Sequence, residues 1–122
     1  PVFDGAHIKP GCTISCVGTY TPDKHELDPA VLLKADKIIC DYKDAALAET
    51  GDLLIPIAQG LLSEGQVLGS IGDVLNGMLP GRESDEEIIV YETVGAAPQD
   101  LCAAMYAYQK ALEIGIGINW GE

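Results

Sequence analysis

The stretch GCTISCVGTYTPDKHELD, residues 11–28, constrains the fold more than any other part of the chain. Its short apolar run, around Ile14, is typical of a β-strand with both faces covered, and Gly18 interrupts that run. A polar loop follows. Asp28 and Pro29 then have the pattern of a helix start, with Asp as the cap and Pro as the first helical residue. Strand, glycine turn, polar loop and helix in this order predict an α/β fold.

A second strand is predicted at Lys37–Asp41 (KIICD), after a short helix at Pro29–Ala35. Strand, helix and strand within this length form a βαβ unit, so the two strands are expected to be parallel. A third strand is predicted at Ile88–Val94, where β-branched and aromatic residues gather. The fold class is therefore a mainly parallel sheet of about three strands with flanking helices.

A long helix is predicted from Pro98 to about Ile114, with Asp100 in its first turn. Four apolar side chains repeat along it at helical spacing, and we expect them to pack in a core; they are Leu101, Met105, Tyr108 and Leu112. A last extended segment is predicted over residues 116–120. We divide the chain into residues 1–95, the sheet domain, and residues 96–122, the C-terminal helix and tail.

Three shorter features complete the local predictions. Asp52 is expected to cap a helix over residues 53–59, and Ser70 a helix over residues 71–76. Arg82, the only arginine, lies in a polar loop. It suits either a bound phosphate or a structural salt bridge with a nearby acid such as Glu83 or Asp85, and the salt bridge is favoured.

Composition excludes several classes of partner. The chain has 122 residues and a net charge of −12, which argues against nucleic acid and anionic membranes. No apolar run approaches the roughly 20 residues that span a bilayer, and no signal peptide opens the sequence. The four cysteines lack zinc-site spacing, so no metal is expected, and we predict reduced, buried thiols in a cytoplasmic protein; they are Cys12, Cys16, Cys40 and Cys102.

The polar loop between Thr19 and His25 has two interpretations. In parallel α/β sheets, ligands bind outside the carboxyl ends of the strands, and this loop follows such an end. Polar loops are equally normal as plain connections between a strand and a helix. Local chemistry alone leaves both open.

Four motifs resemble those of the ornithine cyclodeaminase/mu-crystallin family. They occur in order along nearly the whole chain: VGTYTPDKHELD (17–28), AETGDLLIP (48–56), LPGRESDEEI (79–88) and ETVGAAPQDLCAA (92–104). The resemblance implies an NAD(P)-dependent enzyme acting on a small amino or imino acid, such as a cyclodeaminase, an imine or ketimine reductase or an amino-acid dehydrogenase. It also implies a Rossmann domain and a separate dimerisation and substrate domain. A few members are binding or lens proteins.

The resemblance covers only the second half of a typical member. The chain opens at Pro1, and the G-x-G-x-x-G/A fingerprint that holds the dinucleotide phosphates does not occur in it. We therefore expect a fragment, with residues 1–95 forming the second half of a Rossmann-like domain. NAD or NADP would bind to the full-length parent and not to this chain alone, which is expected to be inactive. We also expect association, either as a homo-oligomer or by pairing with the missing first half.

The resemblance also assigns candidate site residues. Gly18 holds the turn after the signature strand, and Lys24 matches a lysine that contacts the cofactor. Thr93 matches a small hydroxyl residue near the nicotinamide ring, and Gly95, two residues later, is the other candidate for binding the cofactor at this strand end.

Tyr20 stands where ornithine cyclodeaminases have a catalytic aspartate. With an ordinary pKa of about 10, a tyrosine is no carboxylate base, which argues against ornithine cyclodeamination and favours an imine reductase. Tyr20 is then either a proton donor or a packing residue at the pocket wall. The alternative function is a non-catalytic binding protein or a vestigial crystallin-like protein.

Overall fold

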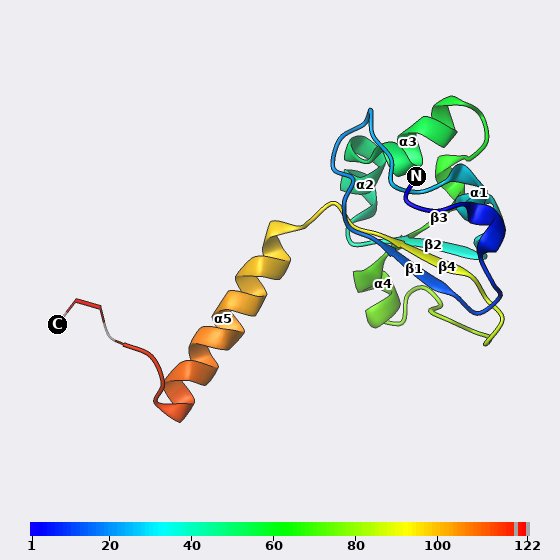
Figure 1. Ribbon diagram of the computed structural model, residues 1–122. Helices are drawn as coiled ribbons and strands as arrows, with labels where there is room; N and C mark the ends of the chain where they lie inside the picture. Colours follow the sequence, from blue (N-terminus) through cyan, green and yellow to red (C-terminus); the bar gives the residue numbers. More distant parts are fainter. Residues whose placement is uncertain (119, 122) are drawn as a thin grey trace.

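The computed structural model describes residues 1–118, 120 and 121. Its sheet and helices alternate along the chain (Figure 1). In order they are β1 (Thr13–Cys16), α1 (Pro29–Lys34), β2 (Lys37–Cys40), α2 (Lys43–Glu49), α3 (Gly51–Ala58), β3 (Val67–Ser70), α4 (Ile71–Leu75), β4 (Ile89–Glu92) and α5 (Ala97–Ile114), with 3₁₀ turns at Gly5–His7 and Glu64–Gln66.

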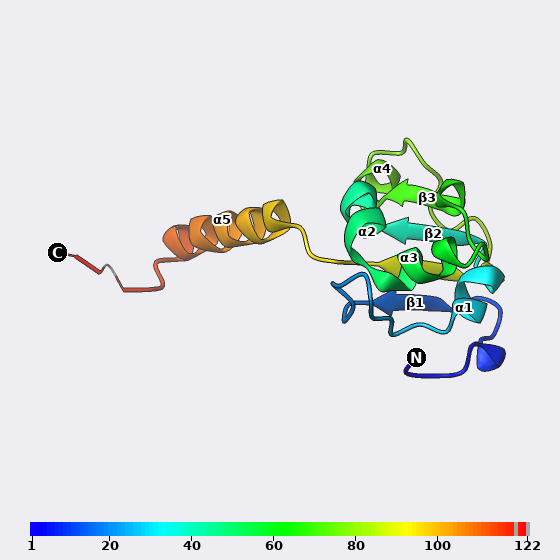
Figure 2. The ribbon, with the colours of Figure 1, turned by 90° about the horizontal axis from the view of Figure 1, so that it is seen from above.

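The four strands form one parallel sheet in the order β1-β4-β2-β3. Figure 2 shows their arrowheads all pointing to the side of the molecule from which α5 leaves. The predicted α/β class and the parallel βαβ unit are confirmed. β4, the last strand in the sequence, is inserted between β1 and β2, and this central position buries it.

β3 is a strand that the sequence pattern did not indicate, so the expectation of about three strands was too low. It lies at the edge of the sheet and pairs with β2, with Ile38 opposite Val67 and Cys40 opposite Ser70. Its four residues, VLGS, include a glycine, which weakens any local strand signal. The extended conformation of this segment therefore depends on its pairing with β2, a strand distant in the sequence.

The core lies between one face of the sheet and α1, α2 and α3 (Figure 1). It contains Cys16, Leu27, Val31, Leu32, Ile38, Cys40, Ala46, Leu53, Leu62, Val67 and Val90. Of the helices, only α4 lies on the opposite face. There Thr13 and Ser15 of β1 are exposed, so the prediction that this strand is covered on both faces was wrong.

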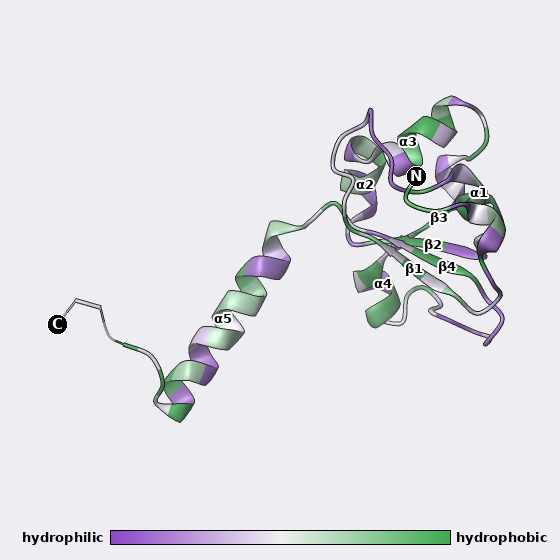
Figure 3. Cartoon of the chain, viewed as in Figure 1, coloured by the Kyte–Doolittle hydropathy of each residue, from purple (hydrophilic) through white to green (hydrophobic). Residues whose placement is uncertain are grey.

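Helix α5 extends away from the sheet as a separate rod of 18 residues (Figures 1 and 3). Its apolar stripe does not pack in a core, contrary to the prediction, because Leu101, Met105, Tyr108 and Leu112 remain 52–65% exposed. The stripe shows that one face of the helix is apolar, but no other described segment covers it. Cys102 on the same helix is exposed, so the prediction of a buried thiol was wrong there.

The predictions for the remaining thiols and for the helix starts are confirmed only in part. Cys16 and Cys40 are buried free thiols, as predicted, and Cys12 is half-buried. Ser70 does precede α4, with its N–H donating to Asp73 Oδ2 at 3.2 Å.

Asp52, however, is not a cap. Thr50 caps α3 through its hydroxyl, which accepts from Asp52 N at 3.2 Å, so Asp52 lies in the first helical turn. The extended segment predicted over residues 116–120 includes residue 119, which lies outside the described residues.

Arg82 forms no salt bridge with Glu83, Asp85 or another acid in the described part of the chain. Its guanidinium donates to the carbonyls of Ser84, Glu87 and Cys12, and to Thr13 Oγ1 at 2.8 Å. These bonds tie the polar loop before β4 to the start of β1. The predicted carboxylate partner was wrong, because backbone oxygens of the folded loop occupy the guanidinium.

Candidate functional site

Three strands end side by side and bring the candidate residues to one edge of the sheet, here called the carboxyl edge. Glu92 at the end of β4 is paired with Cys16 of β1 and with Cys40 of β2. Just beyond, Thr93 N donates to Cys16 O at 3.0 Å, and Asp41 N donates to Glu92 O at 3.0 Å. The loops that follow these strands therefore start next to one another.

The loop over residues 17–28 is held at its start by its own Glu26. Glu26 Oε1 accepts Val17 N at 2.7 Å and Gly18 N at 2.9 Å. A Cβ atom at Gly18 would lie 2.8 Å from Glu26 Oε2, closer than side chains tolerate. A carboxylate of the chain itself therefore occupies the N–H group of Gly18 and lies close to its Cα.

The same loop is fixed to the start of α3. Asp52 Oδ1 accepts Glu26 N at 2.9 Å and Leu27 N at 2.7 Å, and Asp52 is almost fully buried. Gly51 N donates to Thr21 O at 3.0 Å, and a Cβ atom at Gly51 would lie 2.0 Å from Lys24 O. The backbone of the loop is therefore pressed against α3 and is a fixed element of the site.

Asp28 closes the far end of the loop and begins α1, as predicted. Its carboxylate accepts Ala30 N and Gly5 N, each at 3.0 Å. These two bonds hold the pKa of the Asp28 carboxyl below its usual value. One carboxylate thus joins the helix start to the first residues of the chain.

Asp41 organises the segment that follows β4. Asp41 Oδ2 accepts the Thr93 hydroxyl at 2.6 Å and Gly95 N at 2.8 Å, while Oδ1 accepts Tyr42 N at 2.7 Å. Gly95 has a φ of +90°, a conformation that glycine adopts readily, and nothing lies within 4 Å of where its Cβ would be. Thr93 and Gly95 are therefore brought together, with open space beside the Gly95 backbone.

A buried acid lies beneath this edge. Glu92 has no solvent exposure, and its Oε1 accepts the Thr50 hydroxyl at 3.1 Å. Burial, and next the charge of Asp52, raises the pKa of the Glu92 carboxyl to about 8. Glu92 is thus mostly protonated at neutral pH. Burial also raises the pKa of the neighbouring Cys16 thiol, with Glu92 as the second cause, so Cys16 is no thiolate nucleophile.

The side chains of Tyr20 and Lys24 lie exposed on the loop that follows β1, and Tyr20 is 70% exposed. Among the described residues no hydrogen bond or ion pair joins either side chain to Thr93 or Gly95. The geometry thus unites Thr93 and Gly95, and places Gly18 one strand away.

Sequence reasoning missed the acids that shape the edge, namely Glu26, Asp41, Asp52 and Glu92. For Asp41 a signal existed, because it directly follows the strand KIIC, and the rule that ligands bind at the carboxyl ends of strands applies to it as well. Glu26 and Asp52 carried no comparable signal, since 19 acids are scattered along the chain.

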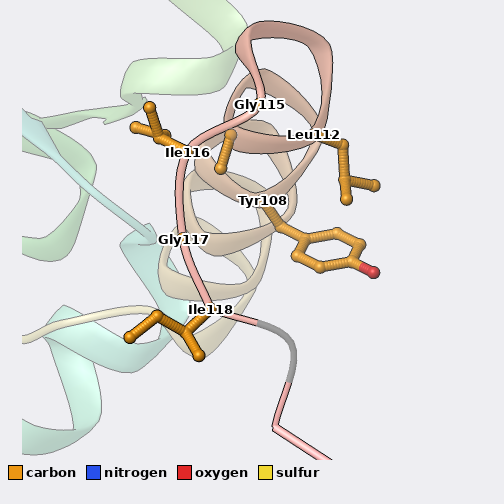
Figure 4. Close-up of a pocket in the computed structure, with 7 residues that line it drawn as sticks. Tyr108, Leu112, Gly115, Ile116, Gly117 and Ile118 are labelled. Carbon is orange, nitrogen blue, oxygen red and sulfur yellow. The ribbon is translucent and has the colours of Figure 1, made fainter. Parts of the chain in front are cut away.

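Two cavities lie away from this edge. One, of about 340 Å³, is formed where the chain folds back after Gly115, and is lined by Tyr108, Leu112, Ile116 and Ile118 (Figure 4). The other, of about 360 Å³, lies on the sheet face opposite the core, beside Ser15, Ile39 and Tyr91. None of the side chains that line the first cavity is charged, so it offers no carboxylate, amine or imidazole for acid–base catalysis.

In the described ranges no group of three or more His, Cys, Asp or Glu side chains lies close enough together to hold a metal ion. No described helix is both long enough and apolar enough to cross a bilayer.

The geometry of the edge suits a ligand that donates hydrogen bonds. The carboxylates of Glu26 and Asp41 accept hydrogen bonds here from N–H groups of the chain itself. The Thr93 hydroxyl donates to Asp41, so its oxygen is left as an acceptor. A phosphate finds no cationic side chain bound to Thr93, Gly95 or Asp41 among the described contacts. The edge can therefore orient an uncharged, N–H-bearing group.

Comparisons with known proteins agree with the motifs. The sequence profile described as the ornithine cyclodeaminase/mu-crystallin family matches residues 1–115. A Δ1-pyrroline-2-carboxylate reductase from Bacillus cereus is 40% identical over 117 residues, which is 96% of this chain and 36% of the relative. An alanine dehydrogenase from Archaeoglobus fulgidus is 33% identical over the same share.

Solved structures give the same result. The Δ1-pyrroline-2-carboxylate reductase of Thermococcus litoralis, in complex with NADH and L-proline, superposes with a TM-score of 0.89 at 38% identity, covering 98% of this chain and 37% of that one. The iminosuccinate reductase of Paracoccus denitrificans, in complex with NAD+, gives a TM-score of 0.81 at 35% identity, covering 94% and 34%. The chain spans little more than a third of the length of these relatives.

Proposed function

Because this chain belongs to the ornithine cyclodeaminase/mu-crystallin family, we propose that it forms the second half of an NAD(P)-binding domain in an enzyme acting on a small amino or imino acid. Residues 1–95 would be that half-domain, and residues 96–122 would lead out of it. The observation that carries the proposal is the joint fixing of Thr93 and Gly95 by Asp41 at the carboxyl edge. Dinucleotides bind at this edge in doubly wound sheets.

The residues of the edge fit a nicotinamide group. Thr93 supplies a half-buried hydroxyl, and the exposed backbone of Gly95 has open space beside it. When bound, NAD(P)H would supply the hydride. Thr93 and Gly95 would fix the orientation of the ring, and orientation is the main contribution of a protein to nicotinamide chemistry. Gly18 and Lys24 would border the same group.

We favour imine reduction over ornithine cyclodeamination. Tyr20 replaces the aspartate of the cyclodeaminases, and its exposed phenol is accessible for donating a proton to an imine nitrogen. Δ1-Pyrroline-2-carboxylate reductases that are 33–40% identical to this chain support the same class. A cyclic imino acid such as Δ1-pyrroline-2-carboxylate is the first substrate to test.

Catalysis would require more protein than these residues. The relatives are almost three times longer than the matched region, and the phosphate-binding fingerprint does not occur in this chain. We propose that the exposed face of α5 and the outer edge of β1 contact the remaining part of the enzyme or a second subunit. The free buried thiols suit a cytoplasmic location.

The test is an assay of the complete gene product that contains these residues. NADH or NADPH oxidation is measured with Δ1-pyrroline-2-carboxylate, with iminosuccinate and with pyruvate plus ammonia. Turnover with an imino acid supports the proposal. Nucleotide binding without turnover on any of them would favour the alternative, a binding protein related to the crystallins, for which Tyr20 at the aspartate position is the supporting observation. Absence of both binding and turnover contradicts both functions.

A further inference from the structure

A hydrogen bond from the Thr93 hydroxyl to Asp41 has a defined direction. A carboxylate has no proton to give, so at the Thr93 Oγ1 to Asp41 Oδ2 distance of 2.6 Å the hydroxyl must be the donor. Its oxygen can then only accept from any other neighbour. Gly95 N–H, at 3.4 Å from Thr93 Oγ1, is in a position to donate to it.

From this geometry we infer that Asp41 is a positioning residue that fixes Thr93 as a hydrogen-bond acceptor, so that the ligand at the carboxyl edge must present a hydrogen-bond donor there. The inference rests on the proposed function for the identity of the ligand. In a nicotinamide ring the only such group is the carboxamide NH₂. Asp41 itself does not touch the ligand and acts through Thr93.

The position of Asp41 suits this role. It is 6% exposed, and its two oxygens accept three hydrogen bonds, from Tyr42 N, Thr93 Oγ1 and Gly95 N. Hydrogen bonds to an ionised group are short and strong, so the side chain has little freedom to turn. Through these bonds one buried carboxylate determines both the direction of the Thr93 hydroxyl and the turn at Gly95.

Tyr91 is the other polar neighbour of this group. Burial, and next the charge of Asp41, raises the pKa of the Tyr91 phenol, while a hydrogen bond with Thr93 lowers it. The phenol therefore keeps its proton at neutral pH. Tyr91→Phe removes this neighbour and leaves the bond between Asp41 and Thr93 intact, which makes it a matched control.

The first measurement needs no nucleotide. In NMR spectra of the chain in water, the Thr93 hydroxyl proton should exchange slowly, because Asp41 holds it. In Asp41→Ala this proton should exchange rapidly, and in Tyr91→Phe it should remain protected. A Thr93 hydroxyl proton that exchanges rapidly in the unaltered chain overturns the inference.

The second measurement compares two nucleotides that differ only at the N–H group. NADH carries a carboxamide, and reduced 3-acetylpyridine adenine dinucleotide carries a methyl ketone in its place. The complete gene product should bind NADH roughly tenfold more tightly, the ratio expected for one hydrogen bond. Thr93→Ser should keep the preference, and Thr93→Val should abolish it.

The double variant separates positioning from folding. Asp41→Ala should reduce the preference for NADH, and it should have no further effect on that preference once Thr93 is Val. A merely structural role would weaken both nucleotides equally, in either background, and that result overturns the inference. If the unaltered protein binds neither nucleotide, the proposed function fails, while the exchange of the hydroxyl proton still decides the role of Asp41.

Discussion

Glu92 and Thr50 form a hydrogen bond in the interior of the domain, with 3.1 Å between Glu92 Oε1 and Thr50 Oγ1, and neither side chain is exposed to solvent. The bond links the central strand β4 to the residue that caps α3. The second oxygen of Glu92 has no hydrogen-bond partner among the described residues. A charged carboxylate is costly in such a place, so the protonated form is favoured.

Stability should therefore fall as pH rises. The Glu92 pKa is about 8 in the folded chain and near 4.5 in the unfolded chain. Below pH 4.5 both states hold the proton, and the stabilising contribution is complete. Between about pH 4.5 and pH 8 only the folded state holds it, so the free energy of unfolding decreases by up to about 1.4 kcal/mol per pH unit. Urea titrations at pH 5, 6, 7 and 8 measure this slope.

Glu92→Gln is the control for that slope. Glutamine keeps the size and the acceptor oxygen but does not titrate, so the slope between pH 5 and pH 8 should disappear. The depressed pKa values of Asp28 and Glu87 act in the opposite sense and only at lower pH, below their ordinary values of 3.8 and 4.5. An unchanged slope in Glu92→Gln would show that another group is responsible.

Asp52→Ala should destabilise the chain by about 1–3 kcal/mol, because it leaves two backbone N–H groups, of Glu26 and Leu27, without their acceptor. Thermal unfolding followed by circular dichroism measures the loss. Asp23→Ala removes an exposed acid from the same loop and should change stability by less than about 0.5 kcal/mol. Equal effects of the two variants would contradict the fixing of the loop by Asp52.

Gly51→Ala and Gly72→Ala form a pair with opposite expected outcomes. At Gly51 a Cβ atom would lie 2.0 Å from Lys24 O, so the loop must move and stability should fall. At Gly72, inside α4, nothing lies within 4 Å, and alanine should stabilise by about 0.5–1 kcal/mol through its higher helix propensity. The urea concentration at the midpoint of unfolding measures the stability of each variant. An alanine at residue 51 that leaves this midpoint unchanged would refute the close approach of Lys24 O to Gly51.

The exposed apolar stripe of α5 should cause the isolated chain to associate. Met105 and Leu112 are 52% and 61% exposed, and contact between two such stripes would remove them from water. Light scattering at ~0.15 M salt, where charge repulsion is screened, should show a mass that rises with concentration. The double variant Met105→Glu, Leu112→Glu should remain monomeric.

Ala103→Glu with Ala107→Glu is the matched control for association. It adds the same charge on the other side of the helix, because residues three and four apart share a face, and residue 103 lies away from residue 105. Association should persist in this control. Loss of association in both double variants would mean that net charge, and not the stripe, governs it.

The sequence predicted the parts of the fold that have local signals. The strand and helix of residues 11–35 are marked by an apolar run, Gly18, Asp28 and Pro29, each of which acts through its own backbone preference. β3 has no such mark and exists because it pairs with β2. The stripe on α5 is a second case that local signals could not decide. Its spacing predicts an apolar face on the helix but does not predict which segment, if any, covers that face.

The candidate site was predictable only as a region. The rule for the carboxyl ends of strands located Gly18, Thr93 and Gly95 at one edge. The bond from Asp41 to Thr93 joins residues 52 positions apart, and only the insertion of β4 beside β2 brings them together. The positions of Tyr20 and Lys24 depend on a loop whose backbone is held by Glu26 and Asp52. Acids are so common in this chain that neither Glu26 nor Asp52 could be singled out from the sequence.

Gly95 is the last residue held by the sheet before α5 begins two residues later. The bond from Gly95 N to Asp41 therefore places the point from which α5 leaves the sheet at the carboxyl edge. A molecule that binds at Thr93 and prefers one geometry at this point would change the orientation of α5. By thermodynamic reciprocity, whatever restrains α5 must alter the affinity of the edge by the same factor. Binding at the edge and the orientation of α5 would then be coupled through the hydrogen bond between Gly95 and Asp41.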